Sequence, residues 1–247
     1  MTYRSFTRLS AALIALAVAL AAIFPPAHSA EENRKVTVVS FGLFGGQGVF
    51  RSEANGAAEV VTARFGAGPV VVRFNTKRGG NATVETLAET LQMQARSMNR
   101  DDDILFVILT SHGSPDGLAV NAGKLAETLK PSSLAEILER TGVRYKVVVI
   151  SACYSGVFIP RIANADTLVI TAADAHHPSF GCEDRAKWTY FGDAFFNIAL
   201  RQTKNLKEAF LLARTIVSKR ELRQRFEPSN PQMAGGANVE SLLAARP

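Results

Sequence analysis

The stretch KVVVISACYSG, residues 146–156, decides the fold that this sequence predicts. Its first half is a continuous run of apolar, mostly β-branched residues, which is typical of a strand buried on both faces of a parallel sheet. The run ends abruptly in small residues and delivers Cys153 at the carboxyl end of that strand. Ligands of open parallel sheets bind at this end. Cys153 therefore stands where a functional side chain is expected.

A second run of the same kind lies about forty residues upstream, where DILFVILTS, residues 103–111, delivers His112 and Gly113. If both strands are parallel, their carboxyl ends meet at one edge of the sheet and set an imidazole beside the thiol. An imidazole gives a cysteine thiolate character, and backbone N–H groups stabilise the oxyanion formed on an attacked carbonyl. Acyl transfer through Cys153 is the reaction class that fits, with the N–H groups of Gly113 and Cys153 as oxyanion donors.

The rest of the chain alternates expected strands with expected helices. Such alternation, with near-continuous apolar strands, predicts an α/β fold: a three-layer α/β/α sandwich with a mostly parallel sheet. The strands are expected at residues 34–41, 69–74, 103–111, 146–153 and 167–172, and the helices at 49–65, 83–100, 131–141, 156–162, 188–201 and 206–225.

Local signals refine this pattern. Residues 119–130 are consistent with a small hairpin, and Ser132 or Ser133 is the expected N-cap of the helix that Gly142 follows. The tail after Pro228 is rich in Pro and Gly and is expected to be irregular. We find no internal repeat. The expected organisation is one domain over residues 30–247, with its core at about 34–228.

The first 29 residues have the features of a secretory signal peptide. Arg4 and Arg8 precede an apolar stretch at 11–24, and Ala27-His28-Ser29 offers small residues for cleavage after Ser29. The apolar stretch is short for a membrane span, so an uncleaved anchor is the lesser alternative. We therefore expect a periplasmic or secreted protein that has no membrane partner after cleavage.

Charge and composition exclude some classes of partner. The chain has 28 basic and 22 acidic residues and a net charge of +6, which becomes +4 once Arg4 and Arg8 are removed with the signal. No basic run with interleaved aromatic residues is present, so nucleic acid is not an expected partner. The basic residues at 219–225 are expected to form a solvated helix face.

The two cysteines leave alternatives open. Export would place Cys153 and Cys182 where disulfides form, and a bond between them would leave a non-catalytic, peptide-binding module. His176 and His177 also lie in a carboxyl-end loop, so they compete with His112 for the role of base or, with Cys182, form part of a metal site. No further ligand pattern accompanies these three residues, and no metal is predicted.

A nucleotide-binding fold is the third alternative. Glycines follow the first expected strand in GLFGGQG, residues 42–48. The dinucleotide fingerprint needs G-x-G-x-x-G, however, and Arg51 stands at the position of its third glycine. The sequence therefore gives no support for a nucleotide cofactor.

Three stretches carry a resemblance to a known family: ILTSHGS at 108–114, VISACYSG at 149–156, and the segment from FGC at 180–182 to TYFGDAFF at 189–196. They resemble the histidine-glycine and alanine-cysteine pair of the caspase-like cysteine peptidases of clan CD. Within that clan the chain is most similar, from about Lys35 to Gln232, to bacterial members of the legumain-type C13 peptidases.

This resemblance implies a caspase-like fold and the hydrolysis of peptide bonds through a thioester. It implies that Cys153 is the nucleophile, that His112 is the general base or ion-pair partner, and that Gly113 and Cys153 supply the oxyanion donors. It further implies a peptide or protein substrate and no cofactor. A transpeptidase, in which an amine intercepts the same thioester, is the alternative within the family.

The resemblance also implies substrate-binding residues. Legumains recognise asparagine with an arginine and two acids; Arg51 matches the arginine, Asp193 matches one acid, and Ser151 occupies the position of the second acid. The asparagine that assists the base in legumains falls near Val49, and Ser111 stands where legumains have an aspartate before the histidine. The implied preference is for asparagine or another polar residue before the cleaved bond.

Overall fold

The structure is a computed structural model that describes residues 34–66 and 68–244. The expected signal peptide, residues 1–29, lies outside the described residues. The chain from Arg34 onward forms one compact unit.

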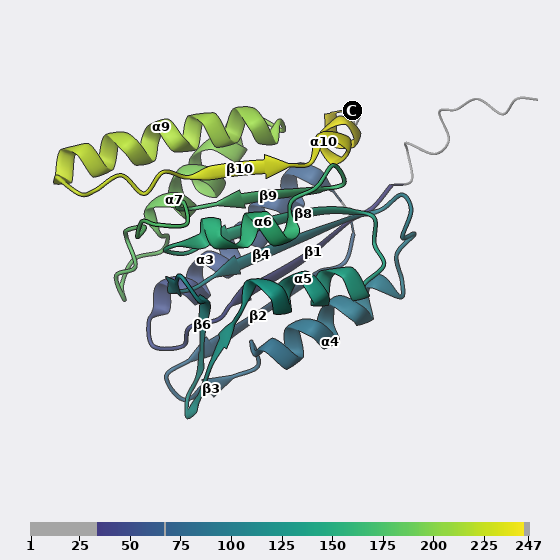
Figure 1. The fold of residues 1–247 in the computed structure, drawn as a ribbon, viewed down its shortest axis with the longest axis horizontal. Helices are drawn as coiled ribbons and strands as arrows, with labels where there is room; N and C mark the ends of the chain where they lie inside the picture. Colours follow the sequence, from purple (N-terminus) through teal and green to yellow (C-terminus); the bar gives the residue numbers. More distant parts are fainter. Residues whose placement is uncertain (1–33, 67, 245–247) are drawn as a thin grey trace, which may run out of the picture. The chain divides into compact units, whose positions relative to one another are not determined.

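A seven-stranded sheet runs through this unit in the order β10-β9-β8-β4-β1-β2-β3 (Figure 1). Five neighbouring strands are parallel, and the two edge strands are antiparallel to their neighbours. The order reverses at β1, because β2 lies on one side of it and β4 on the other, so that a ligand-binding crevice is expected at the carboxyl ends of β1 and β4. The strands are β1 (Val36–Gly42), β2 (Val70–Thr76), β3 (Gly79–Gly80), β4 (Ile104–Thr110), β8 (Tyr145–Ser151), β9 (Thr167–Thr171) and β10 (Gln232–Gly235).

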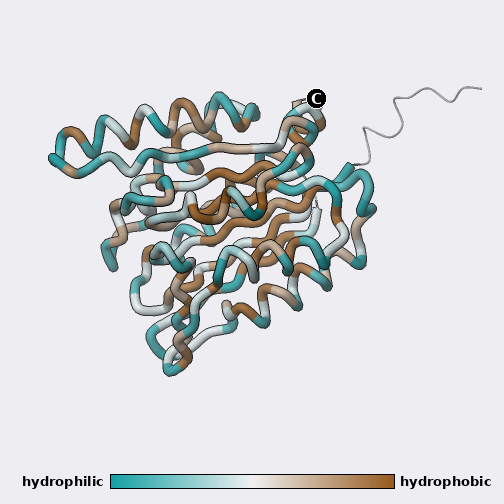
Figure 2. Tube along the Cα trace, in the orientation of Figure 1, coloured by the Kyte–Doolittle hydropathy of each residue, from teal (hydrophilic) through white to brown (hydrophobic). Residues whose placement is uncertain are grey.

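The central strands are the apolar runs of the sequence. Every residue of β1, β4 and β9 is buried, and the most hydrophobic segments of Figure 2 lie along these strands. Such strands need a layer of helices on each face, because their side chains point alternately to the two sides. In β1, Val38 belongs to one buried cluster and Val39 to the other.

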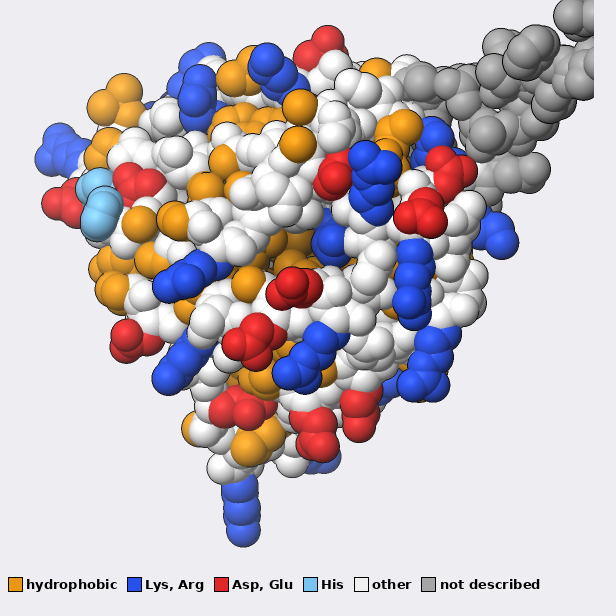
Figure 3. Space-filling model, turned by 45° about the vertical axis from the view of Figure 1, so that its right-hand side comes forward, with side chains coloured by type: hydrophobic (Ala, Val, Ile, Leu, Met, Phe, Trp, Pro, Cys, Tyr) orange, Lys and Arg blue, Asp and Glu red, His pale blue; other side chains and the backbone are white. Residues whose placement is uncertain are grey.

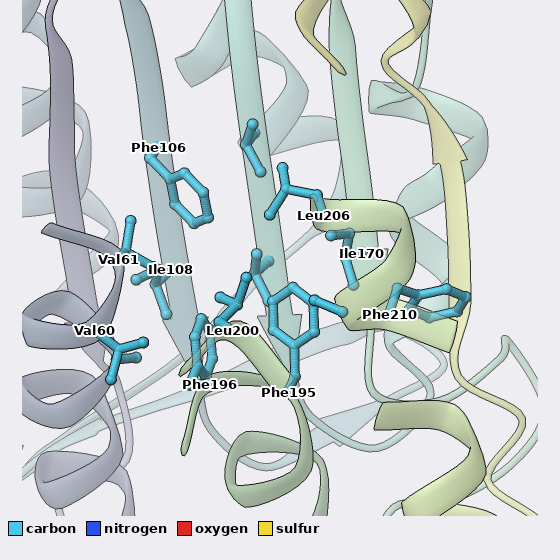
Figure 4. Close-up of a cluster of buried hydrophobic side chains, with 14 of the residues drawn as sticks. Val60, Val61, Phe106, Ile108, Ile170, Phe195, Phe196, Leu200, Leu206 and Phe210 are labelled. Carbon is cyan, nitrogen blue, oxygen red and sulfur yellow. The ribbon is translucent and has the colours of Figure 1, made fainter. Parts of the chain in front are cut away.

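Helices supply both layers, as predicted. One cluster joins the sheet to α3, η2, α9 and α10, and Figure 4 shows its centre, where Phe195 and Phe196 of η2 face Phe106 and Ile108 of β4. The other joins the sheet to α4, α5, η1 and α6. The three-layer α/β/α fold is thereby confirmed. The helices are α3 (Gly48–Phe65), α4 (Val84–Ala95), α5 (Pro131–Arg140), η1 (Ser155–Phe158), α6 (Ile159–Ile162), α7 (Tyr190–Gly192), η2 (Asp193–Ala199), α8 (Leu200–Gln202), α9 (Leu206–Gln224) and α10 (Ala237–Ala244).

A small antiparallel sheet follows β4, formed by β5 (Gly113–Ser114), β6 (Gly117–Ala122) and β7 (Leu125–Leu129). The hairpin expected within residues 119–130 is therefore confirmed. Its first strand begins directly after His112, and the carbonyl of His112 accepts a hydrogen bond from the N–H of Ala119 at 2.9 Å. This small sheet consequently holds the backbone at the end of β4.

Several expected helix ends differ from the structure. The N-cap of α5 is Lys130 and not Ser132 or Ser133, because Pro131 takes the first helical position, where its fixed φ and missing N–H suit the helix. Helix α4 ends at Ala95 rather than near residue 100. The single helix expected over 188–201 is three consecutive pieces, α7, η2 and α8, and the middle piece is a π-helix.

The expectation of an irregular tail and of a core that ends near residue 228 is wrong. Strand β10 pairs with β9, and α10 buries Val239 and Leu243 in the same apolar cluster as η2 and α9. Without β10, the apolar strand β9 would leave its backbone groups unpaired at the sheet edge. The four residues of β10 are too few for a periodic pattern to indicate a strand from the sequence.

Charged side chains are scattered over one face of the molecule, among uncharged and hydrophobic groups (Figure 3). Basic and acidic groups are interspersed on the face shown in Figure 3. Among the described residues, no helix combines the length and the apolar character needed to cross a membrane.

We expect the tail to contribute to stability. The side chain of Leu243 is only 6% exposed, so Leu243→Ala should lower the free energy of unfolding by about 2 kcal/mol or more through the cavity that it leaves. Leu222→Ala is the matched control, since Leu222 is 80% exposed and its truncation should change stability by no more than about 0.5 kcal/mol. Urea denaturation measures both; equal effects would contradict the packing of α10.

Candidate active site

His112 lies at the carboxyl end of β4, half-buried between two aromatic rings. The rings of Phe44 and Phe50 meet it edge to face, with centroids at 4.7 and 4.9 Å from that of the imidazole. These contacts remove water from the ring, and burial lowers the pKa of His112 below its ordinary value of 6.5. The imidazole is therefore held in its neutral, basic form at pH 7.

Gln47, the N-cap residue of α3, holds this imidazole in place. Its side-chain nitrogen donates to the carbonyl oxygen of Cys182 at 2.6 Å, which turns its Oε1 toward Nε2 of His112, and these two atoms are hydrogen-bonded. Because an amide oxygen only accepts, the hydrogen-bond network assigns the ring proton to Nε2. Nδ1 is left as the basic nitrogen.

Cys153 lies two residues beyond the end of β8. The next residue, Tyr154, has a left-handed backbone conformation with φ of 54°, which makes the turn after the strand sharp. Sγ of Cys153 accepts a hydrogen bond from the N–H of Ser179 at 3.2 Å and lies 3.4 Å from the carbonyl oxygen of the same residue. Both backbone polar groups of Ser179 therefore lie against the thiol.

The loops that carry His112 and Cys153 touch each other. Strands β4 and β8 are neighbours, with Thr110 paired to Ser151. A Cβ added to Gly113 would lie only 2.0 Å from the carbonyl oxygen of Cys153, so no other residue fits at this position. The structure thus brings His112, Gly113 and Cys153 together. In the described chain, the hydrogen bonds of the His112 ring and of Sγ lead to Gln47 and Ser179 and not to each other.

The structure does not bring the three expected substrate-binding residues into one pocket. Ser151 is buried, and its hydroxyl bonds to that of Thr189 at 3.0 Å. The carboxylate of Asp193 forms an ion pair with Arg220 of α9 at 2.5 Å. Arg51 is exposed on α3, where its guanidinium lies 5.9 Å from the centre of the Phe74 ring.

Arg51 instead lines a cavity of about 410 Å³ next to His112. Gln47 joins the two sites, since it lines this cavity and also contacts the imidazole. The cavity is rich in basic groups, and its one acidic group, Asp184, forms an ion pair with Lys77 at 3.3 Å. The lining residues are Gly45, Gln47, Gly48, Arg51, Asn75, Thr76, Lys77, Arg78 and Asp184.

His177, one of the two histidines that compete with His112 for the role of base, has another partner. Nδ1 of His177 lies 2.8 Å from both carboxylate oxygens of Asp174. Cys153 and Cys182 are both free thiols, and burial raises the pKa of Cys182 to about 12, which keeps that thiol protonated. Over residues 34–66 and 68–244, no group of three or more His, Cys, Asp or Glu side chains is arranged to hold a metal ion.

Together, the fold and the site define a class of protein: a three-layer α/β protein with a histidine and a cysteine at neighbouring carboxyl ends of a parallel sheet. The model of the peptidase C13 family matches residues 79–237. The chain belongs to this family and is a cysteine-type peptidase. The match begins after α3, so Gln47 and Arg51 lie outside it.

Solved structures with the same fold include two forms of an insect caspase. The crystal structure of caspase-1 from Spodoptera frugiperda aligns over 81% of this chain and 85% of its own, with a TM-score of 0.53 and 16% identity. The structure of pro-sf-caspase-1 aligns over 82% of this chain and 92% of its own, with a TM-score of 0.55 and 15% identity. The caspase-like fold is thereby confirmed. No curated protein matches the chain significantly in sequence.

Sequence reasoning missed two residues of the site. Gln47 gives one available signal, because it is the only polar side chain in the glycine-rich loop GLFGGQG after the first strand. Ser179 gives none, since it contacts Cys153 mainly through its backbone, and any residue except proline can present such an N–H group.

We expect the imidazole of His112 to titrate below pH 6.5, because burial favours its neutral form. Gln47→Glu should raise this midpoint, because a carboxylate at Nε2 stabilises the imidazolium. NMR titration of the ring protons measures both values, with His112→Asn to assign the signal. A midpoint of 6.5 or above that Gln47→Glu leaves unchanged would contradict the described environment of the ring.

Proposed function

We propose that the protein is an exported endopeptidase that cleaves peptide bonds with a dyad of Cys153 and His112. One observation carries the proposal: the backbone of Gly113, next to His112, lies against the carbonyl of Cys153, at the carboxyl ends of the neighbouring strands β4 and β8. Family membership gives the reaction class. The imidazole is neutral, and it uses Nε2 for its hydrogen bond to Gln47. Nδ1 is therefore left to act as the base, which supports this role for His112.

In this proposal, the thiol proton of Cys153 passes to Nδ1 of His112, and Sγ attacks the substrate carbonyl. The N–H groups of Gly113 and Cys153 stabilise the resulting oxyanion. The intermediate collapses to a thioester as the amine leaves with the proton from His112. Water then attacks the thioester with His112 as base, which releases the acid and restores the thiol. The partly exposed position of Cys153 gives water access and favours hydrolysis over transfer to an amine.

Export is supported by the sequence of residues 1–29 alone, which has the charged, apolar and small-residue regions of a signal peptide. We place the mature protein in the periplasm or outside the cell. Cleavage after Ser29 would leave a chain that begins just before β1, so removal of the signal would cost no element of the sheet.

Intact mass spectrometry after reaction with a peptidyl acyloxymethyl ketone tests both parts of the proposal. We expect one adduct, mapped to Cys153, on a chain that starts at Ala30. The adduct should be absent in Cys153→Ala and at least about tenfold slower to form in His112→Ala, because the imidazole promotes the thiolate. Cys182→Ala is the matched control and should react normally. Labelling of Cys182, or none from a mixed-sequence probe set, would refute the dyad.

The cavity beside Gln47 supports a preference for a polar residue before the cleaved bond. Arg51 and Arg78 line it, and neither guanidinium forms an ion pair within the described part of the chain. Guanidinium groups bind the oxygens of carboxylates and carboxamides. We propose that asparagine or aspartate occupies this cavity, with Arg51 as the binding group and without Asp193.

We expect Arg51→Ala to raise KM about tenfold for substrates with asparagine or aspartate before the cleaved bond, because it removes a charge-assisted hydrogen bond. The same substitution should leave KM for an alanine substrate almost unchanged. Steady-state kinetics on matched peptides measures this selectivity, with Arg220→Ala as the control that frees Asp193. If Arg220→Ala changes the selectivity between these substrates and Arg51→Ala does not, the proposed binding role of Arg51 is wrong and the role belongs to Asp193.

A further inference from the structure

Glu53 is a fully buried carboxylate behind the active site. It lies in the second turn of α3 on the face toward the sheet, and none of its surface is exposed. No lysine, arginine or histidine forms an ion pair with it in the described chain. A buried ionisable group without a countercharge is costly to the fold, and such groups cluster at functional sites.

The hydrogen bonds of Glu53 lead to the ends of the two strands that carry the dyad. Oε1 accepts from the hydroxyl of Thr110, the last residue of β4, at 2.9 Å. The hydroxyl of Ser151, the last residue of β8, bonds to that of Thr189 at 3.0 Å, and the backbone N–H of Thr189 donates to this carboxylate. Thr110 and Ser151 are paired across the two strands, and each stands two residues before a member of the dyad.

The same carboxylate reaches the segment that covers the thiol. Oε2 accepts from the backbone N–H of Thr189 at 2.7 Å, where the loop through Ser179 ends and α7 begins. The fit is tight, because a Cβ added to Gly192 would lie 1.9 Å from Oε2. One side chain on α3 therefore bonds directly to β4 and to the start of α7, and it reaches β8 through Thr189.

We propose that Glu53 is a positioning residue for the peptidase reaction. Its carboxylate fixes the ends of β4 and β8 relative to each other and thereby sets the spacing of His112 and Cys153. The link to Thr189 holds the loop whose Ser179 N–H faces Sγ, and α3 also carries Gln47, which orients the imidazole. This inference rests on the proposed dyad and assigns a role to a residue outside the matched range of the family model.

If Glu53 is a positioning residue, its substitution should lower activity without lowering the stability of the fold. Burial raises the pKa of Glu53 above its ordinary value of 4.5, so the unfolded chain loses this proton more readily than the folded chain. The ionised group therefore costs stability as the pH rises above 4.5. Glu53→Gln removes the charge and keeps the length of the side chain, so it should leave the melting temperature at pH 7 equal to or higher than that of the wild type.

We expect Glu53→Gln to lower kcat by about tenfold or more with little change in KM, because neutral hydrogen bonds hold the strand ends less firmly. Thr110→Val removes the link to β4 and keeps the charge, and it should have the same effect. The matched control is Glu221→Gln, which removes a buried carboxylate of α9 that bonds to the N–H of Ser229 at 3.2 Å, and it should leave kcat unchanged.

The pH dependence of Cys153 alkylation by iodoacetamide gives a readout that needs no peptide substrate. Looser spacing moves the imidazole away from the thiol whose proton it accepts, so both Glu53→Gln and Thr110→Val should raise the pH midpoint of alkylation by about half a pH unit or more. If Glu53→Gln acted only by removing a negative charge near the thiol, it would instead lower the pH midpoint of Cys153 alkylation. An unchanged or lowered midpoint, or an unchanged kcat, would overturn the positioning role.

His112→Ala distinguishes failure of this inference from failure of the proposed function. If His112→Ala raises the alkylation midpoint and neither Glu53→Gln nor Thr110→Val does, the dyad stands and only the role of Glu53 is refuted. If His112→Ala leaves the midpoint unchanged, no dyad exists, and the proposed function and the positioning role are both refuted.

Discussion

The close approach of the Gly113 backbone to the carbonyl of Cys153 is the contact on which the rest of the site depends. This contact follows from the parallel pairing of β4 with β8, in which Thr110 lies beside Ser151. Because these are the last residues of the two strands, both strands end side by side at the same edge of the sheet. Side chains two residues further along then share one crevice. A glycine is required because any Cβ would force the two loops apart and separate the imidazole from the thiol.

Such a contact is only as rigid as the sheet below it. The apolar strands β1, β4 and β9 are buried along their whole length, and helices from both ends of the chain cover the sheet. The C-terminal segment completes this arrangement, since β10 pairs with the outer edge of β9 and α10 packs on the same apolar cluster. Strand β10 and helix α10 thus belong to the scaffold that holds the site.

Polar groups behind the crevice turn this scaffold into a chemical site. Gln47 fixes the tautomer of His112, the N–H of Ser179 faces the thiol, and the carboxylate of Glu53 joins the elements that carry all three. Burial keeps the imidazole of His112 neutral, and it keeps the thiol of Cys182 protonated. Gln47 also lines the basic cavity, so this cavity adjoins the site of His112.

The sequence by itself determined the five parallel strands, the three-layer fold and the placement of His112 and Cys153 at neighbouring strand ends, because buried parallel strands are continuous apolar runs and their ends are marked by small residues. Only the tertiary structure decided what lies around that pair. Arg51 and Asp193 match a family pattern in sequence, yet Asp193 pairs with Arg220 while Arg51 lines another cavity. Gln47, Glu53 and Ser179 act through contacts with residues far away in the chain, and local patterns carry no record of such distances. The short strand β10 is also decided by a distant contact: it is a strand because it pairs with β9, and its own composition does not indicate one.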